Sequence, residues 1–166
     1  MFFLYNNIGD YMNKKTNGVL FFGTLFFIVD QILKIFMSSN FNLNQTKVLI
    51  SNFLNITLVH NTGAAFNILT GNRILLILIG LAAFIGLLIY LRRCDNLTDM
   101  DVLTYSLLLG GIMGNLIDRI IHGYVIDYIS LIFNGKYFPV FNFADMCIVV
   151  SIILLICTTL KEDLWK

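Results

Sequence analysis

The sequence predicts an all-α integral membrane protein with four transmembrane helices. Hydrophobic residues make up 58% of the 166-residue chain and charged residues 13%, whereas charged residues are about 25% of an ordinary soluble domain. The apolar residues form stretches that do not alternate with polar residues, which favours helices over barrel strands. Each stretch is close to the roughly 20 residues that a helix needs to cross a bilayer core. The expected spans are residues 18–37, 74–91, 102–121 and 143–160.

The length suits a single membrane-embedded domain over residues 1–166. The net charge of +1 leaves no basic surface for nucleic acid. The three cysteines and two histidines do not stand at the spacings of a zinc site. We therefore expect no metal, no cofactor and free apolar cysteines. A monomer is the simpler expectation for the oligomeric state.

The placement of lysine and arginine predicts the orientation, because cytoplasmic loops carry the excess of positive charge. The loops 38–73 and 122–142 hold three such residues, and the other flanks hold six. Both termini are therefore expected in the cytoplasm, with the two loops outside. The first stretch follows two lysines, as a signal peptide would, but its apolar part is long and no small-residue cleavage site follows it, so a retained helix is expected. The six residues are Lys14, Lys15, Arg92, Arg93, Lys161 and Lys166.

The outer loop 38–73 contains β-branched and aromatic residues that predict two short strands, at residues 48–53 and 54–59. The segment 61–63, Asn-Thr-Gly, follows them as a turn. A small sheet is therefore expected on the outer face of the membrane, over the helix ends.

Ionisable residues inside a membrane are costly, so each needs a partner or a function. Asp30 and Lys34 stand four residues apart with the acid first, the favourable order for a helical ion pair. A structural pair and a direct contact with substrate both remain open. In the third stretch, Asn115, Asp118 and Arg119 share one helix face that must point into the bundle. They serve either as helix–helix contacts or as site residues, and Asp118 and Arg119 should have different partners.

Gly110 and Gly114 in the third stretch form a G-x-x-x-G pattern, which allows another helix backbone to approach closely. They lie on the same stretch as the polar residues above. The third helix is therefore expected to pack tightly against a neighbour.

Asp127 and Asp145 lie at the expected outer membrane boundary, one after the third stretch and one at the start of the fourth. If Asn142 caps the fourth helix, Asp145 occupies its third position. Two carboxyl groups brought together share one proton and can activate water against a peptide carbonyl. The alternative is a pair of unrelated carboxylates that reach the membrane interface.

Five segments follow one another in a characteristic order, and together they resemble bacterial lipoprotein signal peptidase, the signal peptidase II family. They cover most of the chain from Asp30 onward, and Ile126 and Met146 are small departures from the usual pattern. The segments are Asp30-Gln31-x-x-Lys34, His60-Asn61-Thr62-Gly63-Ala64-Ala65-Phe66, Gly110-Gly111-x-x-Gly114-Asn115-Leu116-Ile117-Asp118-Arg119, Val125-Ile126-Asp127-Tyr128 and Phe138-Pro139-x-Phe141-Asn142-x-Ala144-Asp145.

The resemblance implies a function and a set of roles. Asp127 and Asp145 match the catalytic pair of an aspartic-type endopeptidase. The implied substrate is a diacylglyceryl-modified prolipoprotein, cleaved before its lipid-modified cysteine at the outer face of the bacterial cytoplasmic membrane. The family's fold implies a small extracytoplasmic β-cradle between helices 1 and 2, and its members are inhibited by globomycin-type peptides. The matching substrate-binding positions are Asn61, Gly63, Asn115, Arg119 and Asn142, and the supporting positions are Asp30, Lys34 and Asp118.

Two other classes of function remain open. The aspartates could form a relay in a proton- or ion-coupled transport subunit, although paired helix breaks and an inverted repeat are not visible. A non-catalytic membrane chaperone for lipoproteins could share the pocket without cleaving.

Overall fold

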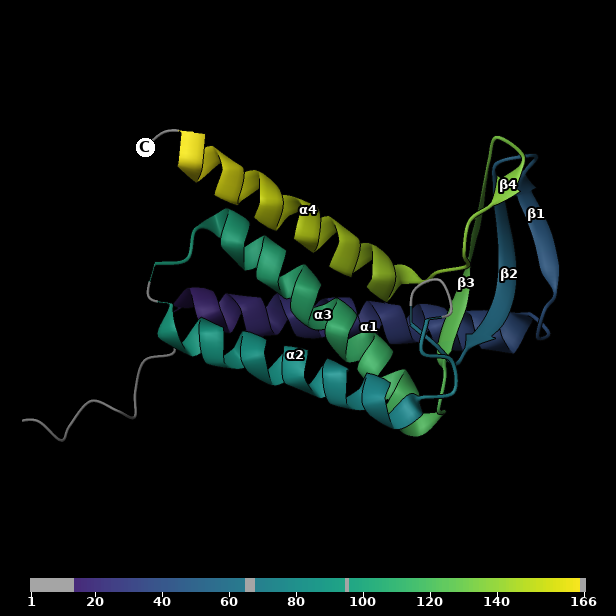
Figure 1. The fold of residues 1–166 in the computed structure, drawn as a ribbon, viewed down its shortest axis with the longest axis horizontal. Coiled ribbons are helices and arrows are strands. Elements are labelled where there is room, and N and C mark those ends of the chain that lie inside the picture. The colour runs from purple at the N-terminus through teal and green to yellow at the C-terminus, as the bar shows by residue number, and fades with distance from the viewer. Residues whose placement is uncertain (1–13, 65–67, 95, 165–166) are drawn as a thin grey trace, which may run out of the picture.

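The computed structural model describes residues 14–64, 68–94 and 96–164, with side chains described up to residue 160. Ala65, Phe66, residues 1–13 and the charges of the two C-terminal lysines lie outside this part of the chain. Figure 1 shows the helices lying side by side, with a small sheet at one end of the bundle. The elements are α1 (Lys14–Asn40), β1 (Thr46–Ile50), β2 (Leu54–Asn61), α2 (Arg73–Arg93), α3 (Asp99–Ile121), β3 (Val125–Phe133), β4 (Lys136–Tyr137) and α4 (Phe143–Leu164).

All four expected helices are present, and all four are long and apolar enough to cross a membrane. The chain is therefore a multi-pass membrane protein. Most helices extend a few residues beyond the apolar stretches, because polar residues continue a helix into the interface. At α3 the extension has a clear cause. Thr98 accepts a hydrogen bond from the Asp101 backbone N–H, and the Asp101 carboxylate accepts one from the Thr98 N–H, a capping box that starts the helix before its apolar part.

Helix α3 is the central element of the bundle. In its membrane window 56% of the residues are buried, against 17–22% in the other three helices. Glycine makes this packing close. A Cβ added to Gly110 would lie 2.6 Å from Phe26 Cβ on α1, and one added to Gly111 would lie 2.6 Å from the carbonyl oxygen of Ala144 on α4. The expected close approach along the G-x-x-x-G stretch is confirmed.

The sheet has four antiparallel strands in the order β1-β2-β3-β4. Strands β3 and β4 come from the segment between α3 and α4, which we expected to be a loop. The all-α label and a cradle built only between helices 1 and 2 are therefore not confirmed. The β-branched and aromatic residues of β3 form a strand because β2 lies beside them. That pairing joins residues 64 to 77 positions apart, so no local sequence pattern reveals the partner.

The boundary between the two expected strands also differs. β1 ends at Ile50 and β2 begins at Leu54, so residues 51–53 form a turn. Asn52 has a φ of 58° there, a left-handed conformation that asparagine tolerates better than most residues. Two adjoining strands cannot reverse direction without such a turn, which shortens the first strand.

The polarity of the helices places the sheet at a defined end of the bundle. The C-terminal ends of α1 and α3 and the N-terminal ends of α2 and α4 meet the sheet, whereas the first turn of α1 and the C-terminal end of α4 lie at the far end (Figure 1). The segment that joins α1 to α2 and the segment that joins α3 to α4 therefore both lie at the sheet end of the bundle, where their side chains can meet.

Candidate active site

Asp127 lies on β3, where pairing with β2 places it opposite Val59. Its side chain is 1% exposed. Both carboxylate oxygens accept amide donors: Asn61 Nδ2 donates to Oδ2 at 2.8 Å, and Asn142 Nδ2 donates to Oδ1 at 2.7 Å. A buried carboxyl group is thus held in one orientation by two neutral donors.

Asp145 lies in the first turn of α4, and Asn142 caps that helix as expected. Asn142 Oδ1 accepts a hydrogen bond from the Asp145 N–H at 2.9 Å, and Asp145 Oδ2 accepts one from the Asn142 N–H at 3.1 Å. The other oxygen, Oδ1, accepts from Asn115 Nδ2 at 2.7 Å. Asp145 is half-buried, so its carboxylate is more accessible than that of Asp127.

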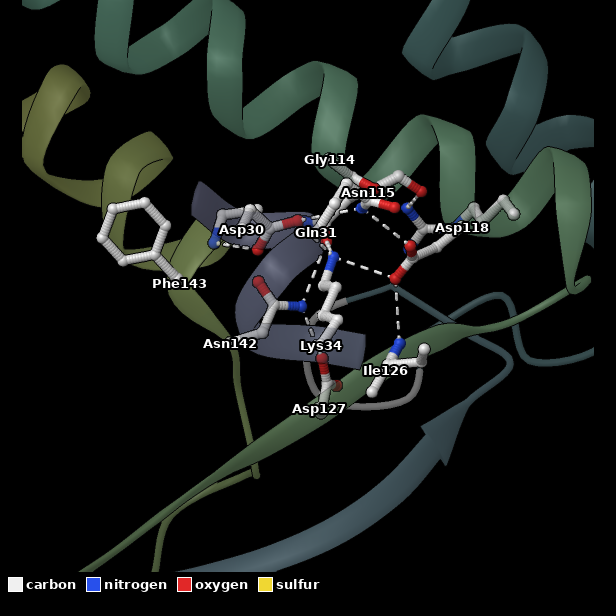
Figure 2. A network of polar contacts seen from close by, with 12 residues as sticks. Asp30, Gln31, Lys34, Gly114, Asn115, Asp118, Ile126, Asp127, Asn142 and Phe143 are labelled. Carbon is white, nitrogen blue, oxygen red and sulfur yellow. Dashed lines mark hydrogen bonds and ion pairs between the residues drawn. The ribbon is translucent and has the colours of Figure 1, made fainter. Parts of the chain in front are cut away.

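The structure brings the two aspartates together through Asn142. The side-chain nitrogen of Asn142 reaches Asp127 on one strand and Asn115 Oδ1 at 3.1 Å on α3, while its backbone and carbonyl oxygen hold Asp145. Figure 2 shows Asn142 beside Lys34, with Asp127 below both of them. Asn142 is fully buried, so it fixes both carboxyl groups relative to one frame.

Burial raises the pKa of Asp127, and the nearby charge of Asp145 raises it as well, to a value of about 7. The hydrogen bonds from Asn61 and Asn142 and the charge of Lys34 oppose the shift. A low-dielectric site and a neighbouring negative charge both favour the protonated form of a carboxyl group. Near neutral pH Asp127 can therefore hold a proton.

A second group of polar contacts surrounds Gly63. Its N–H donates to Asn61 Oδ1 at 2.9 Å, and its carbonyl oxygen accepts from Arg119 Nη2 at 2.9 Å. Arg119 Nη1 also donates to the carbonyl oxygen of Asn115 at 3.3 Å. Arg119 therefore binds backbone carbonyls, as its planar donors allow, and it links α3 to the segment after β2.

The expected ion pair between Asp30 and Lys34 is confirmed, at 2.8 Å, and it belongs to a larger cluster of polar contacts. Lys34 Nζ also contacts Asp118 Oδ2 at 2.9 Å and donates to Asn115 Oδ1 at 3.3 Å. Lys34, Asp30 and Asp118 are each 1% exposed. Asp118 and Arg119 have different partners, as their adjacent positions on the helix predicted.

The structure shows contacts of three residues that sequence reasoning missed. Gln31 Nε2 donates to both Asp30 Oδ2 and Asp118 Oδ1. Arg73, at the start of α2, donates to the carbonyl oxygens of Arg119 and Ile120. The Phe143 N–H donates to the Tyr128 hydroxyl. The position of Gln31 beside Asp30 could have predicted its contact with that carboxylate. The contacts of Arg73 and Phe143 join distant segments that no local pattern connects.

Within the described residues, no group of three or more histidine, cysteine, aspartate or glutamate side chains is placed to hold a metal ion. All polar side chains named above instead bond to one another or to backbone. The polar groups present at this site are carboxyl groups, amides and a guanidinium.

Comparison with known proteins gives a consistent result. The profile of the family described as signal peptidase (SPase) II matches residues 22–161. The lipoprotein signal peptidase of Pseudomonas fluorescens is 36% identical over 150 residues, which are 87% of this chain and 88% of the relative. That of Shewanella amazonensis is 34% identical over 159 residues, covering 92% and 94%. That of Symbiobacterium thermophilum is 36% identical over 128 residues, covering 77% and 84%.

Solved structures agree with the sequence comparison. A bacterial membrane enzyme determined by the in meso method at 2.3 Å resolution matches with a TM-score of 0.82 and 31% identity, covering 89% of this chain and 90% of the other. A second bacterial membrane enzyme, at 1.9 Å, matches with a TM-score of 0.74 and 32% identity, covering 88% and 94%. The resemblance drawn from the five motif segments is confirmed.

Proposed function

The chain belongs to the signal peptidase II family, and from that premise we propose that it is a membrane aspartyl endopeptidase with Asp127 and Asp145 as its catalytic pair. Its substrate is a diacylglyceryl-modified prolipoprotein, and it cleaves before the lipid-modified cysteine. The observation that carries the proposal is the bonding of both carboxyl groups to Asn142. The matched family is a peptidase family, so the ion-transport interpretation receives no support.

The proton that Asp127 holds decides which carboxyl group acts as the acid and which as the base. The carboxylate of Asp145 takes a proton from a water molecule as the water oxygen bonds to the scissile carbonyl carbon. Asp127, whose pKa is raised to about 7 by burial and by the charge of Asp145, donates its proton to the carbonyl oxygen. The tetrahedral intermediate then collapses, the C–N bond breaks, and the amine leaves with the proton that Asp145 took from water. The Asp127 carboxylate takes back a proton from a hydroxyl group of the collapsing intermediate, which becomes the product carboxylic acid, so both aspartates return to their starting protonation states.

The polar groups around the pair suit a peptide backbone. We assign substrate binding to Asn61, Gly63, Asn115, Arg119 and Asn142, whose amides and guanidinium offer donors and acceptors beside the two carboxyl groups. Asn61 and Arg119 both hold Gly63, so the segment that follows β2 is kept close to the site. No cofactor is needed for these steps, because the water and the two carboxyl groups supply every proton.

The sheet end of the bundle is assigned to the outer face of the bacterial cytoplasmic membrane. The loops at that end hold three lysines and arginines and the other flanks hold six, so the positive-inside rule places both termini in the cytoplasm. A substrate anchored by its acyl chains and its signal helix would present the scissile bond at that interface, which supplies part of the orientation that catalysis needs. The working unit is a monomer formed by one domain over residues 1–166.

The test is cleavage of a diacylglyceryl-modified prolipoprotein by the purified chain in detergent, with Asp127→Asn and Asp145→Asn as isosteric variants. Asp99→Asn is the matched control, because Asp99 is fully exposed at the far end of the bundle. Loss of cleavage in both site variants and retention in the control supports the proposal. Cleavage that persists in both site variants refutes the catalytic pair. Binding without cleavage by the unaltered chain indicates the chaperone, and proton flux in liposomes without cleavage indicates transport.

A further inference from the structure

One buried ammonium group joins two carboxylates from different helices. Lys34 Nζ on α1 lies 2.8 Å from Asp30 Oδ2 on the same helix and 2.9 Å from Asp118 Oδ2 on α3. Figure 2 shows Lys34 reaching between the two helices beside Asp127 and Asn142. We call Lys34, Asp30 and Asp118 the Lys34 bridge. Two acids and one base leave the bridge with a formal charge of −1, so simple neutralisation does not account for its composition.

Each carboxylate of the bridge holds the backbone of a different segment. Asp30 Oδ1 accepts the N–H of Ala144 at 3.0 Å, and Asp118 Oδ2 accepts the N–H of Ile126 at 3.1 Å. Ala144 directly precedes Asp145, and Ile126 directly precedes Asp127. The two amides that immediately precede the catalytic pair are therefore both tied to carboxylates that share Lys34.

Each of these two hydrogen bonds uses a backbone N–H that can donate outside its own helix or strand. Ala144 lies in the first turn of α4, where N–H groups have no partner within the helix and a carboxylate is favourable. Ile126 lies opposite His60 in the β2–β3 ladder, yet its N–H turns to Asp118 on α3. The bridge thus reaches α4 from α1 and β3 from α3.

Gln31 closes the bridge into a ring. Its side-chain nitrogen donates to Asp30 Oδ2 at 3.2 Å and to Asp118 Oδ1 at 3.1 Å. Together with the two ion pairs, these bonds leave the carboxylates little freedom to rotate. The three members of the bridge are each 1% exposed, and charged hydrogen bonds are stronger where water is excluded.

We propose that Lys34 is a positioning residue, which sets the separation of Asp127 and Asp145 by holding Asp30 and Asp118, and through them the amides of Ile126 and Ala144, in one rigid frame. The proposal rests on the assignment of Asp127 and Asp145 as the catalytic pair. A lysine that only joined two helices would not need both carboxylates to bind the residues next to that pair. Small displacements matter here, because a shift of about 1 Å in a catalytic group can cost roughly 100-fold in rate.

The experiment compares Lys34→Met with Lys15→Met. Lys15 is also an ion-paired lysine of α1, 3.2 Å from Asp99 at the far end of the bundle. We expect kcat for prolipoprotein cleavage to fall about 100-fold in Lys34→Met, with KM within about 3-fold of the unaltered chain because the substrate-binding groups remain. Lys15→Met should change neither. A Lys34→Met protein that folds and keeps kcat within about 3-fold overturns the proposal.

The pH profile separates positioning from simple structural support. Asp127 faces the charges of Asp145, Lys34 and Arg119, as well as the amides of Asn61 and Asn142. Lys34 lowers the pKa of Asp127, so removing its charge should move the alkaline limb of kcat/KM to higher pH. Lys15→Met should leave that limb in place. If Lys34→Met has a lowered kcat but its alkaline limb of kcat/KM stays at the same pH, the frame as described is contradicted.

A neutral triple variant covers the case in which Lys34→Met does not fold. Asp30→Asn combined with Lys34→Met and Asp118→Asn leaves no unpaired buried charge, and the asparagine oxygens can still accept the two amides. We expect this protein to fold and to remain about 100-fold slow in kcat, because both ion pairs are gone and only the neutral Gln31 amide still joins the two acceptors. Recovery of kcat to within about 3-fold overturns the proposal.

Amide hydrogen exchange gives a reading that does not depend on cleavage. In Lys34→Met, or in the triple variant, exchange at Ile126 and Ala144 should be at least about 10-fold faster than in Lys15→Met. If exchange responds in this way but the unaltered chain does not cleave, the proposed function fails and the frame stands. If the unaltered chain cleaves but exchange at both amides is unchanged, the frame fails and the function stands.

Discussion

Asn142 donates a 2.7 Å hydrogen bond to Asp127 Oδ1 from a position that also caps α4. The same side chain therefore joins the strand that carries one aspartate to the helix that carries the other. Its side-chain nitrogen donates to Asp127 and Asn115, and its side-chain oxygen accepts a hydrogen bond from the N–H of Asp145. These two functions of one amide group can be separated by substitution.

Asn142→Ser and Asn142→Ala should differ in stability but not in activity. Serine can still accept the Asp145 N–H and cap α4, whereas alanine cannot, and a lost cap costs about 1 kcal/mol. Alanine has no donor, and the single, shorter serine hydroxyl cannot replace the two N–H groups that donate to Asp127 and Asn115, so both variants should lower kcat by at least about 10-fold. Thermal unfolding in detergent and steady-state cleavage would measure the two effects. Equal stability of both variants, or full activity of the serine variant, would show that the amide does not have two separate functions.

The alkaline limb of the kcat/KM profile should lie near pH 7. Burial and the charge of Asp145 raise the pKa of Asp127 to about 7, and the proposed steps need Asp127 to carry its proton. Activity should therefore fall as pH rises through about 7. A profile measured from pH 5 to 9 in constant ionic strength tests this, and activity that stays level to pH 9 would exclude Asp127 as the proton donor.

The same shift predicts how stability depends on pH. The ordinary pKa of an aspartate is 3.8, and that of Asp127 in the folded chain is about 7. Between these values the folded chain holds a proton that the unfolded chain has released, so the stability that the proton contributes is present at low pH and is lost as pH rises through about 7. The Tm of the unaltered chain should fall relative to that of Asp127→Asn between pH 5 and pH 8. A constant Tm difference would mean that the Asp127 carboxyl group does not titrate in this range.

Local patterns in the sequence predicted local structure well. The spacing of Asp30 and Lys34 predicted their ion pair because i,i+4 neighbours always share a helix face. The cap at Asn142 was predicted because capping depends on residues three apart. The four spans were predicted because a helix of about 20 apolar residues crosses the bilayer core and satisfies its own backbone hydrogen bonds in lipid.

Contacts between distant segments could not be predicted in the same way. The bond between Lys34 and Asp118 joins residues far apart in the chain, and no periodicity connects them. Strand β3 was missed because its pairing with β2 decides its conformation. The Asp127 and Asp145 segments were linked in advance by their expected place at the outer membrane boundary and by the family resemblance, whereas Asn142 as their common partner is visible only in the structure.

Arg119→Lys should weaken substrate use although the charge is kept. Arg119 holds the carbonyl oxygens of Gly63 and Asn115 with two different nitrogens, and a lysine ammonium cannot reproduce that planar pair of donors. We expect kcat/KM to fall by about 10-fold or more, mostly through a higher KM, because the segment at Gly63 loses its tether. Steady-state kinetics over a range of prolipoprotein concentrations would show the split. An unchanged KM would argue against a substrate-binding role for this side of the site.

Gly111→Ala should destabilise the bundle, whereas Gly86→Ala should not. A Cβ at Gly111 would lie 2.6 Å from the carbonyl oxygen of Ala144 and 2.7 Å from Ile148 Cγ1, so α4 would have to move away from α3 at a cost of about 1–3 kcal/mol. A Cβ at Gly86, in the exposed middle of α2, would meet no heavy atom of the described residues within 4 Å, and replacing a helical glycine there should stabilise by roughly 0.5–1 kcal/mol. Because Ala144 directly precedes Asp145, Gly111→Ala should also lower kcat, and Gly86→Ala should leave it unchanged. Thermal unfolding and cleavage measured on the same samples would test both effects. A Gly111→Ala protein as stable and as active as the Gly86→Ala protein would contradict the close contact between α3 and α4 beside the site.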